Sequence, residues 1–210
     1  MDITWYGHSC FRLVERGTAT IVTDPYNGGI GYTLPNIKAD IVTISHQAQG
    51  HANLKAWPSS THILTGPGEY EIGGVFVIGV SMHDPEKHES PNVVYVYDYD
   101  GMNIVHLGDL SFVPSQSDID KLGAVNVALV PVGGGNGLTA PQAAEIIGLI
   151  EPEIVVPMHY KTPLTTLDLE PLDRFLKVMG ISKVTPESIL RITERSLPEQ
   201  TQVVVLEPQQ

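Results

Sequence analysis

The chain has 210 residues, of which 42% are hydrophobic and 17% charged, and these are the values of a globular protein with a substantial core. Its formal net charge is −12. Because phosphate contacts need clustered lysine and arginine, and the sequence has no such cluster, this charge argues against a nucleic acid as the partner.

The sequence also lacks the usual features of secreted and membrane proteins. Cys10 is the only cysteine, so neither an intramolecular disulfide nor a zinc site built from cysteines is possible. No basic region precedes an apolar stretch near the N-terminus, and no apolar run approaches the roughly 18 residues that span a bilayer. We therefore expect a cytoplasmic protein without a membrane partner.

The first half of the chain predicts a β-meander. Short runs of β-branched and aromatic residues alternate with glycine, proline, asparagine and aspartate, which favour turns. The predicted strands cover residues 3–6, 9–15, 20–23, 41–45, 61–64, 69–72, 75–81, 93–99 and 102–106. Residues 52–57 are expected to form one or two helical turns, and residues 83–91 a polar loop.

The second half alternates strands and helices. Ser115 with Asp118, and Thr139 with Gln142, are the capping signals of two helices. The predicted helices cover residues 115–122, 139–150 and 169–179, and the predicted strands cover residues 127–132, 154–158, 188–193 and 202–206. This mixed pattern predicts a single α/β domain over residues 1–210, with helices outside two packed sheets.

Four histidines and one aspartate stand where predicted strands end. They are His46, His51, His83, Asp109 and His159. All follow short apolar runs, so we expect them along one edge of the sheets. Imidazole and carboxylate without thiolate suit zinc, manganese or iron. A single carboxylate among several histidines is also what a bridge between two metal ions requires.

The spacing of His46 and His51 restricts the backbone conformation in which both side chains can reach one site. In a helix, residues five apart point about 140° away from each other, at about 100° per residue. The two imidazoles can therefore meet only in a tight loop, which Gly50 favours. The later glycine run at residues 133–137 lacks the Lys-Ser/Thr of a phosphate loop, so we expect it to let the backbone approach the site.

Four short motifs carry a family resemblance. They are Trp-Tyr-Gly-His-Ser at residues 5–9, Thr-Asp-Pro-Tyr at 23–26, Val-His-Leu-Gly-Asp at 105–109 and Val-Pro-Met-His-Tyr at 156–160. With these in order, the chain resembles the metallo-β-lactamase superfamily, and within it the small metal-dependent hydrolases similar to ascorbate-6-phosphate lactonase-like proteins. The resemblance covers nearly the whole chain and implies a four-layer αββα sandwich of two mixed β-sheets flanked by helices.

The signature motif of that superfamily is His-x-His-x-Asp-His, and this sequence departs from it. His46 and His51 match the first and last histidines. Ala48 stands where the middle histidine belongs, and Gly50 stands where the aspartate belongs. Neither side chain can coordinate a metal, so the motif is degenerate.

The resemblance implies two metal sites that share a bridging carboxylate. The ligands it leaves are His46, His83 and Asp109 for the first site, and His51, His159 and Asp109 for the second. Since losing an outer-shell partner alone costs roughly 10–100-fold in metal affinity, we expect reduced occupancy. The expected cofactor is a divalent metal, zinc first, with manganese and iron as alternatives. One ion held by three protein ligands and water remains a normal catalytic set.

Other residues are expected to support the site. The resemblance makes Asp109 and His159 the catalytic residues. His8 could be a partner of the ligands, a substrate contact or a plain turn residue, and Asp24 could orient the site as its counterpart in the family does. Tyr160 and Lys161 directly follow His159 and are candidates to contact a substrate. His106 is expected to pack within its strand, and His62 to lie at the surface.

Two functional hypotheses follow. The first is a metal-dependent hydrolase whose metal-bound hydroxide attacks a lactone, ester or phosphodiester in a small-molecule substrate. The second is a catalytically inactive pseudoenzyme of the same fold that serves as a binding or regulatory module, because Ala48 and Gly50 replace ligands within one motif.

Overall fold

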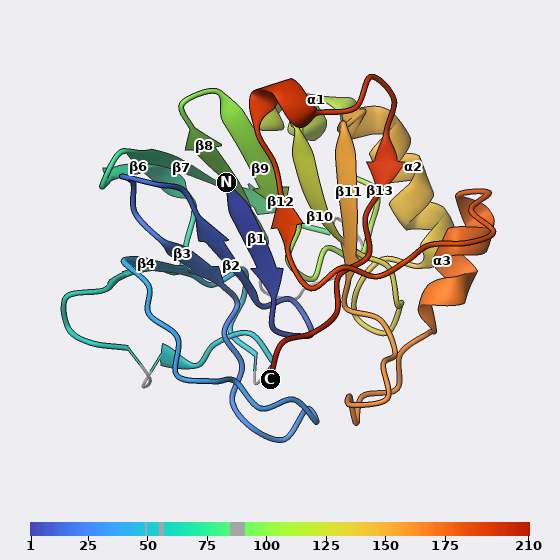
Figure 1. The fold of residues 1–210 in the computed structure, drawn as a ribbon, viewed down its shortest axis with the longest axis horizontal. Coiled ribbons are helices and arrows are strands. Elements are labelled where there is room, and N and C mark those ends of the chain that lie inside the picture. The colour runs from blue at the N-terminus through green and yellow to red at the C-terminus, as the bar shows by residue number, and fades with distance from the viewer. Residues whose placement is uncertain (49, 55–56, 85–90) are drawn as a thin grey trace.

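A computed structural model describes residues 1–48, 50–54, 57–84 and 91–210. Within these residues the chain forms one six-stranded and one seven-stranded β-sheet, packed together with helices beside the second sheet (Figure 1). Both sheets are mixed, so the predicted α/β sandwich is confirmed. In the same part of the chain, no helix is both long and apolar enough to cross a membrane.

The first sheet runs in the order β12-β1-β2-β3-β4-β5. Its strands are β1 (Asp2–Trp5), β2 (Phe11–Val14), β3 (Ile21–Thr23), β4 (Ile41–Thr43), β5 (His62–Leu64) and β12 (Leu190–Arg191). Strands β3, β4 and β5 pair in parallel, whereas the other pairs of this sheet are antiparallel.

The second sheet runs in the order β13-β11-β10-β9-β8-β7-β6. Its strands are β6 (Gly68–Ile72), β7 (Val75–Met82), β8 (Asn92–Tyr99), β9 (Met102–His106), β10 (Val127–Pro131), β11 (Ile154–Met158) and β13 (Gln202–Val203). Strands β9, β10, β11 and β13 pair in parallel, and the meander from β6 to β9 is antiparallel.

Helical segments follow the predicted caps. They are α1 (Gln116–Ile119), α2 (Ala140–Ile150), α3 (Leu172–Val178) and the 3-10 turns η2 (Asp120–Leu122) and η3 (Glu194–Ser196). Thr139 and Gln142 form the predicted capping box of α2. Helix α2 lies beside β10, and α3 lies beside α2 (Figure 1).

Two clusters of apolar side chains hold the layers together. The main core lies between the sheets and under the helices, where Trp5, Phe11 and Phe175 are fully buried. Since side chains alternate along a strand, Val22 of β3 and Val42 of β4 face away from this core and form a second cluster. The chain at residues 25–40 that supplies part of the second cluster is irregular, because its prolines and glycines disfavour a helix.

Hydrogen bonds between the sheets fix the end of β4. The hydroxyls of Thr43 and Tyr97 lie 2.6 Å apart, and the hydroxyl of Tyr95 donates to the backbone oxygens of Leu64 at 3.1 Å and Ile44 at 3.3 Å. These contacts join β8 of the second sheet to β4 and β5 of the first. The chain is therefore joined to the second sheet at Thr43 and Ile44, where it leaves β4.

The structure differs from the sequence predictions at two helical segments and in the last two strands, where β12 and β13 are shorter than the predicted 188–193 and 202–206. Helix α3 begins at Leu172 rather than at residue 169. Glu170 is held in extended chain by two bonds, one from its N–H to the oxygen of Gly133 and one from the N–H of Lys161 to its own oxygen, both 2.8 Å. The predicted turns at 52–57 fall partly on residues 55–56, which lie outside the described residues, and the described part is not an α-helix.

Candidate metal centre

The loop after β4 carries His46 and His51, and Asp24 after β3 organises it. Asp24 accepts hydrogen bonds from the backbone N–H of Ser45 at 2.7 Å, the hydroxyl of Ser45 at 2.6 Å and Nδ1 of His51 at 2.8 Å. An ionised carboxylate can only accept, so Nδ1 of His51 carries a proton. The lone pair of a neutral His51 is therefore on Nε2.

Asp109 follows β9 and lies among the imidazoles. Its Oδ1 is 2.9 Å from Nε2 of His159, and its Oδ2 is 3.5 Å from Nε2 of His51 and 3.7 Å from Nε2 of His46. Parallel pairing explains part of this convergence, because β9, β10 and β11 end at the same edge of the second sheet. The structure thus brings four of the five predicted metal ligands together.

Backbone contacts that sequence reasoning missed hold Asp109 in place. Asn92 accepts a hydrogen bond from the N–H of Asp109 at 3.0 Å and donates to the oxygen of Leu107 at 2.9 Å. Asn92 opens β8 without any motif around it, so the sequence carries no signal for this role. Sequence reasoning also missed Ser45, which donates to Asp24. Its place directly before His46 is a signal that could have found it.

The glycine run lets the backbone approach, as predicted. A Cβ on Gly133 would lie 2.2 Å from the carbonyl oxygen of His159 and 2.6 Å from Cα of Tyr160. Only glycine therefore allows the loop after β10 to pack against the turn that carries His159. His159 itself has a φ of 51°, a conformation that costs a non-glycine residue roughly 1–3 kcal/mol.

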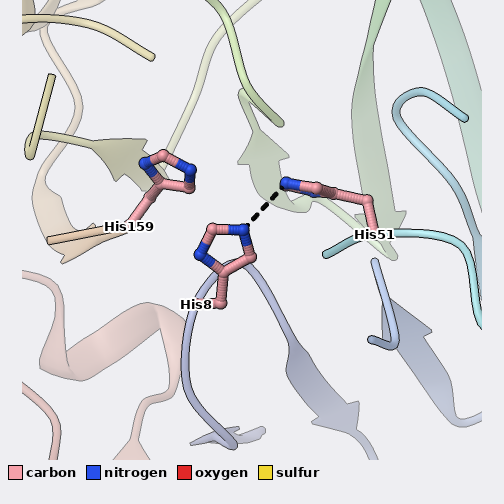
Figure 2. Close-up of side chains that lie close together, drawn as sticks. All are labelled: His8, His51 and His159. Atoms are coloured by element: carbon pink, nitrogen blue, oxygen red, sulfur yellow. Dashed lines mark hydrogen bonds between the residues drawn. The ribbon is translucent and has the colours of Figure 1, made fainter. Parts of the chain in front are cut away.

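His8 enters the centre from the turn between β1 and β2. Its Nε2 lies 3.0 Å from Nε2 of His51, and its ring centre is 4.2 Å from that of His159. The carbonyl oxygen of His8 accepts hydrogen bonds from Nε1 of Trp5 at 3.0 Å and from the N–H of His159 at 3.2 Å. Figure 2 shows that the three imidazoles gather from separate segments of the chain.

The buried charges of the centre are strongly coupled. Burial alone would raise the pKa of both aspartates, but the charge of nearby histidines and the hydrogen bonds they receive lower the pKa of Asp24 and lower that of Asp109 further. Burial would lower the pKa of His51, whereas Asp109 and Asp24 raise it to about 10. For His8, burial and the neighbouring imidazoles together lower the pKa well below its ordinary value.

The centre lines a cavity of about 340 Å³. The walls contain His8, His46, His51, Asp109 and His159, and the remaining lining comes mainly from the loop after β4 and from residues 135–136 and 167–169. A volume of this order is typical of sites for small molecules.

Four predicted site residues do not line this cavity, and one of them, Asp24, lies behind His51 and holds its Nδ1. His83 follows β7 and is exposed, and it belongs to neither of the groups of described residues that could hold a metal. Tyr160 is buried with its ring 5.3 Å from that of Trp5. The ammonium group of Lys161 donates to the oxygens of Thr165 at 2.9 Å and Leu167 at 2.8 Å, so it holds its own loop.

The donor set fits a divalent cation. The described residues contain two groups that could hold an ion, His8 with His51 and His159, and His46 with His51 and Asp109, each with ligand atoms within 4.8 Å of one another. Nδ1 of His8 and Nδ1 of His159 are buried without a hydrogen-bond partner. Two buried carboxylates beside imidazoles favour a bound positive charge, and nitrogen with oxygen donors suits zinc, manganese or iron.

Comparisons with known proteins agree with this architecture. Residues 2–159 match the family described as Beta-lactamase superfamily domain. A UPF0173 protein of Pyrococcus furiosus is 31% identical over 186 residues, which cover 77% of this chain and 84% of that protein. A UPF0173 metal-dependent hydrolase of Thermococcus onnurineus is 28% identical, covering 86% of this chain and 92% of that protein.

Solved structures show the same fold. A Thermotoga maritima protein, described as a candidate Zn-dependent hydrolase of the metallo-beta-lactamase superfamily, is 36% identical with a TM-score of 0.80, covering 98% of this chain and 97% of that chain. A metallo hydrolase of Ignicoccus hospitalis, 23% identical with a TM-score of 0.67, covers 91% of this chain and 99% of its own and shows the fold alone. With the family match over three quarters of its length, the two mixed sheets and the histidine–aspartate centre at their edge, this chain belongs to the beta-lactamase superfamily.

Proposed function

We propose that this protein is a metal-dependent hydrolase that cleaves a lactone, ester or phosphodiester bond in a small-molecule substrate, with zinc as its metal. The observation that carries the proposal is the convergence of His46, His51, Asp109 and His159 in one cavity. The proposal is further supported by the metal-dependent hydrolase names of the UPF0173 relatives.

A bound divalent ion supplies a Lewis acid and makes hydroxide available near neutral pH. The chain's own residues prepare the site for it. Asp24 keeps a proton of His51 on Nδ1, so Nε2 is the nitrogen that would coordinate once a metal displaces its proton. Asp109 stays ionised, because the neighbouring histidines hold its pKa well below the ordinary value despite its burial. Its oxygens can therefore accept hydrogen bonds from water or substrate.

The complete family motif supplies ligands for two metal ions, and the proposed centre holds fewer. Ala48 and Gly50 both line the cavity, at the motif positions of a histidine and an aspartate, and neither offers a ligand. We infer that the chain binds one catalytic ion with a water in its remaining position, as three-ligand catalytic zinc sites do.

The test combines metal analysis with a substrate screen. Protein purified without chelator or metal-affinity tag is analysed by plasma mass spectrometry and assayed with lactone, ester and phosphodiester panels. We expect close to one equivalent of metal and turnover that Asp109→Asn removes, whereas Asp173→Asn on the exposed start of α3 leaves both unchanged. Metal-free protein that takes up no added zinc and turns over nothing would contradict the proposal and favour the pseudoenzyme hypothesis.

A further inference from the structure

We propose that His8 is a metal ligand in this chain, and that the single ion binds between His8, His51 and His159. This inference rests on the proposed function and specifies its metal site. It assigns a coordinating role to a residue outside the signature motif, on the turn between the first two strands.

The three imidazoles have the spacing of a metal site. Their ligand atoms lie within 4.8 Å of one another, and all three residues are buried. The two Nε2 atoms of His8 and His51 are 3.0 Å apart, along the dashed line in Figure 2. In a tetrahedral zinc site with Zn–N bonds of about 2.0–2.1 Å, ligand nitrogens lie about 3.3 Å apart, so little movement separates the present arrangement from a coordinated one.

His51 limits the centre to one ion. Its Nδ1 donates to Asp24, so Nε2 is the only ring nitrogen whose proton a metal can displace, and the one lone pair freed there serves one metal. The His8–His51–His159 set and the His46–His51–Asp109 set both use His51. Within the described part of the chain, the two sets are therefore alternatives rather than neighbouring occupied sites.

Backbone contacts favour the set that contains His8. The N–H of His159 donates to the carbonyl oxygen of His8 at 3.2 Å. This bond joins the two turns that carry His8 and His159, so two of the three ligands are held together by their backbone. His8 is also fixed by the indole N–H of Trp5 at 3.0 Å. The side chain of His46, in contrast, is 21% exposed and its Nε2 is 3.7 Å from Asp109.

Gly50 makes room for the imidazole of His8. A Cβ at position 50 would lie 2.8 Å from Nε2 and 3.1 Å from Cδ2 of His8, which is closer than such atoms normally approach. Any side chain at position 50 would thus compete with His8 for the same space. The glycine that removes a carboxylate ligand from the motif is therefore also what allows His8 to reach the centre.

Metal titration of histidine variants tests the assignment. Zinc affinity is measured by competition with a chelating dye, and Co²⁺ is added to follow coordination by its visible spectrum. We expect His8→Ala to lower zinc affinity by at least the roughly 10–100-fold that loss of an outer-shell partner costs and to change the Co²⁺ spectrum. His62→Ala, at an exposed position of β5, is the matched control and should leave both unchanged.

His46→Ala distinguishes the two ligand sets. If His8 is the ligand, His46→Ala retains one equivalent of zinc while His8→Ala releases it. The reverse pattern overturns the assignment of His8 but leaves the proposed hydrolase intact, because metal is still bound. A wild-type protein that binds no zinc overturns both proposals.

A second pair of variants tests the role of Gly50 without touching a ligand. Gly50→Ala should displace the ring of His8 and weaken zinc binding by roughly tenfold or more, while the metal-free variant still unfolds at a temperature similar to that of the metal-free wild type. Gly66→Ala is the control, because a Cβ there meets nothing within 4 Å. Unchanged affinity and an unchanged Co²⁺ spectrum in Gly50→Ala would count against the inference.

Discussion

Asp24 decides which nitrogen of His51 is available to a metal. We expect Asp24→Asn to lower zinc affinity by roughly 10–100-fold, because an amide NH₂ facing Nδ1 favours the tautomer with its proton on Nε2. Nitrogen chemical shifts of the His51 ring would report the tautomer directly, and calorimetric titration would give the affinity. The exposed Asp173→Asn serves as the control. Unchanged affinity together with an unchanged tautomer would exclude this role for Asp24.

We expect His106 to make the metal-free protein sensitive to acid. It is fully buried in β9, where Nε2 donates to the oxygen of Ser9 at 2.9 Å and Nδ1 accepts from the N–H of Gly108 at 3.2 Å. Both nitrogens are satisfied in the neutral ring, as expected for a histidine that packs within its strand. A second proton would break the Gly108 contact, and burial lowers the pKa of His106.

The lowered pKa of His106 should make the folded protein less stable as the pH falls. A histidine whose folded pKa is below its unfolded value of about 6.5 binds more protons in the unfolded chain, so its contribution to stability is lost as pH falls below about 6.5. The free energy of unfolding should decrease by up to about 1.4 kcal/mol per pH unit for this group. Denaturant unfolding of metal-free protein between pH 5 and 7 should show a smaller slope in His106→Asn than in the wild type, and the same slope in His62→Asn.

At the residue scale, the position of a side chain after a strand predicted four of the five metal ligands, and it was wrong for His83, which directly follows β7 and is exposed. His46, His51, Asp109 and His159 are brought together in this way. The contacts of His8 depend on the turn after β1 meeting the turn after β11, far along the chain, and no local pattern encodes that. Adjacency to His159 likewise suggested Lys161 as a substrate contact, but its ammonium group is used by nearby carbonyls.

At the element scale, α1, α2 and most strands begin within one residue of prediction, whereas α3 begins late and β12 and β13 are shorter than predicted. Alternation and turn residues locate strands from a few neighbouring side chains, and β7 and β8 begin and end within one residue of prediction. The start of α3 depends instead on a long-range backbone bond between Glu170 and Gly133. The covering layer on the first sheet is irregular at residues 25–40, since prolines and glycines there favour extended chain and turns.

The loop after β10 packs directly against the turn that carries His159. We expect Gly133→Ala to destabilise the protein by roughly 1–3 kcal/mol, because its Cβ would collide with backbone of the β11 turn rather than with a flexible side chain. Gly148→Ala in α2, where a Cβ meets nothing within 4 Å, should instead stabilise it by about 0.5–1 kcal/mol through helix propensity. Chemical denaturation measures both, and equal effects would contradict the packing argument.

At the scale of the whole molecule, the candidate metal centre joins the two sheets. His8 and His51 follow β1 and β4 of the first sheet, whereas Asp109 and His159 follow β9 and β11 of the second. An ion bound between them would tie together layers that must separate when the protein unfolds. Metal binding should therefore stabilise the entire fold rather than one loop.

Thermal unfolding measures this coupling. A ligand that binds only the folded state at about 100 times its dissociation constant stabilises it by about 2.7 kcal/mol, which corresponds to roughly 5–10 °C in Tm for a chain of this length. We expect zinc to raise the Tm of the metal-free wild type and of His62→Ala by this amount. His51→Ala should show little shift, because it removes the one imidazole that both candidate ligand sets share. A zinc-dependent shift of equal size in His51→Ala would place the ion elsewhere and separate metal binding from this edge of the sheets.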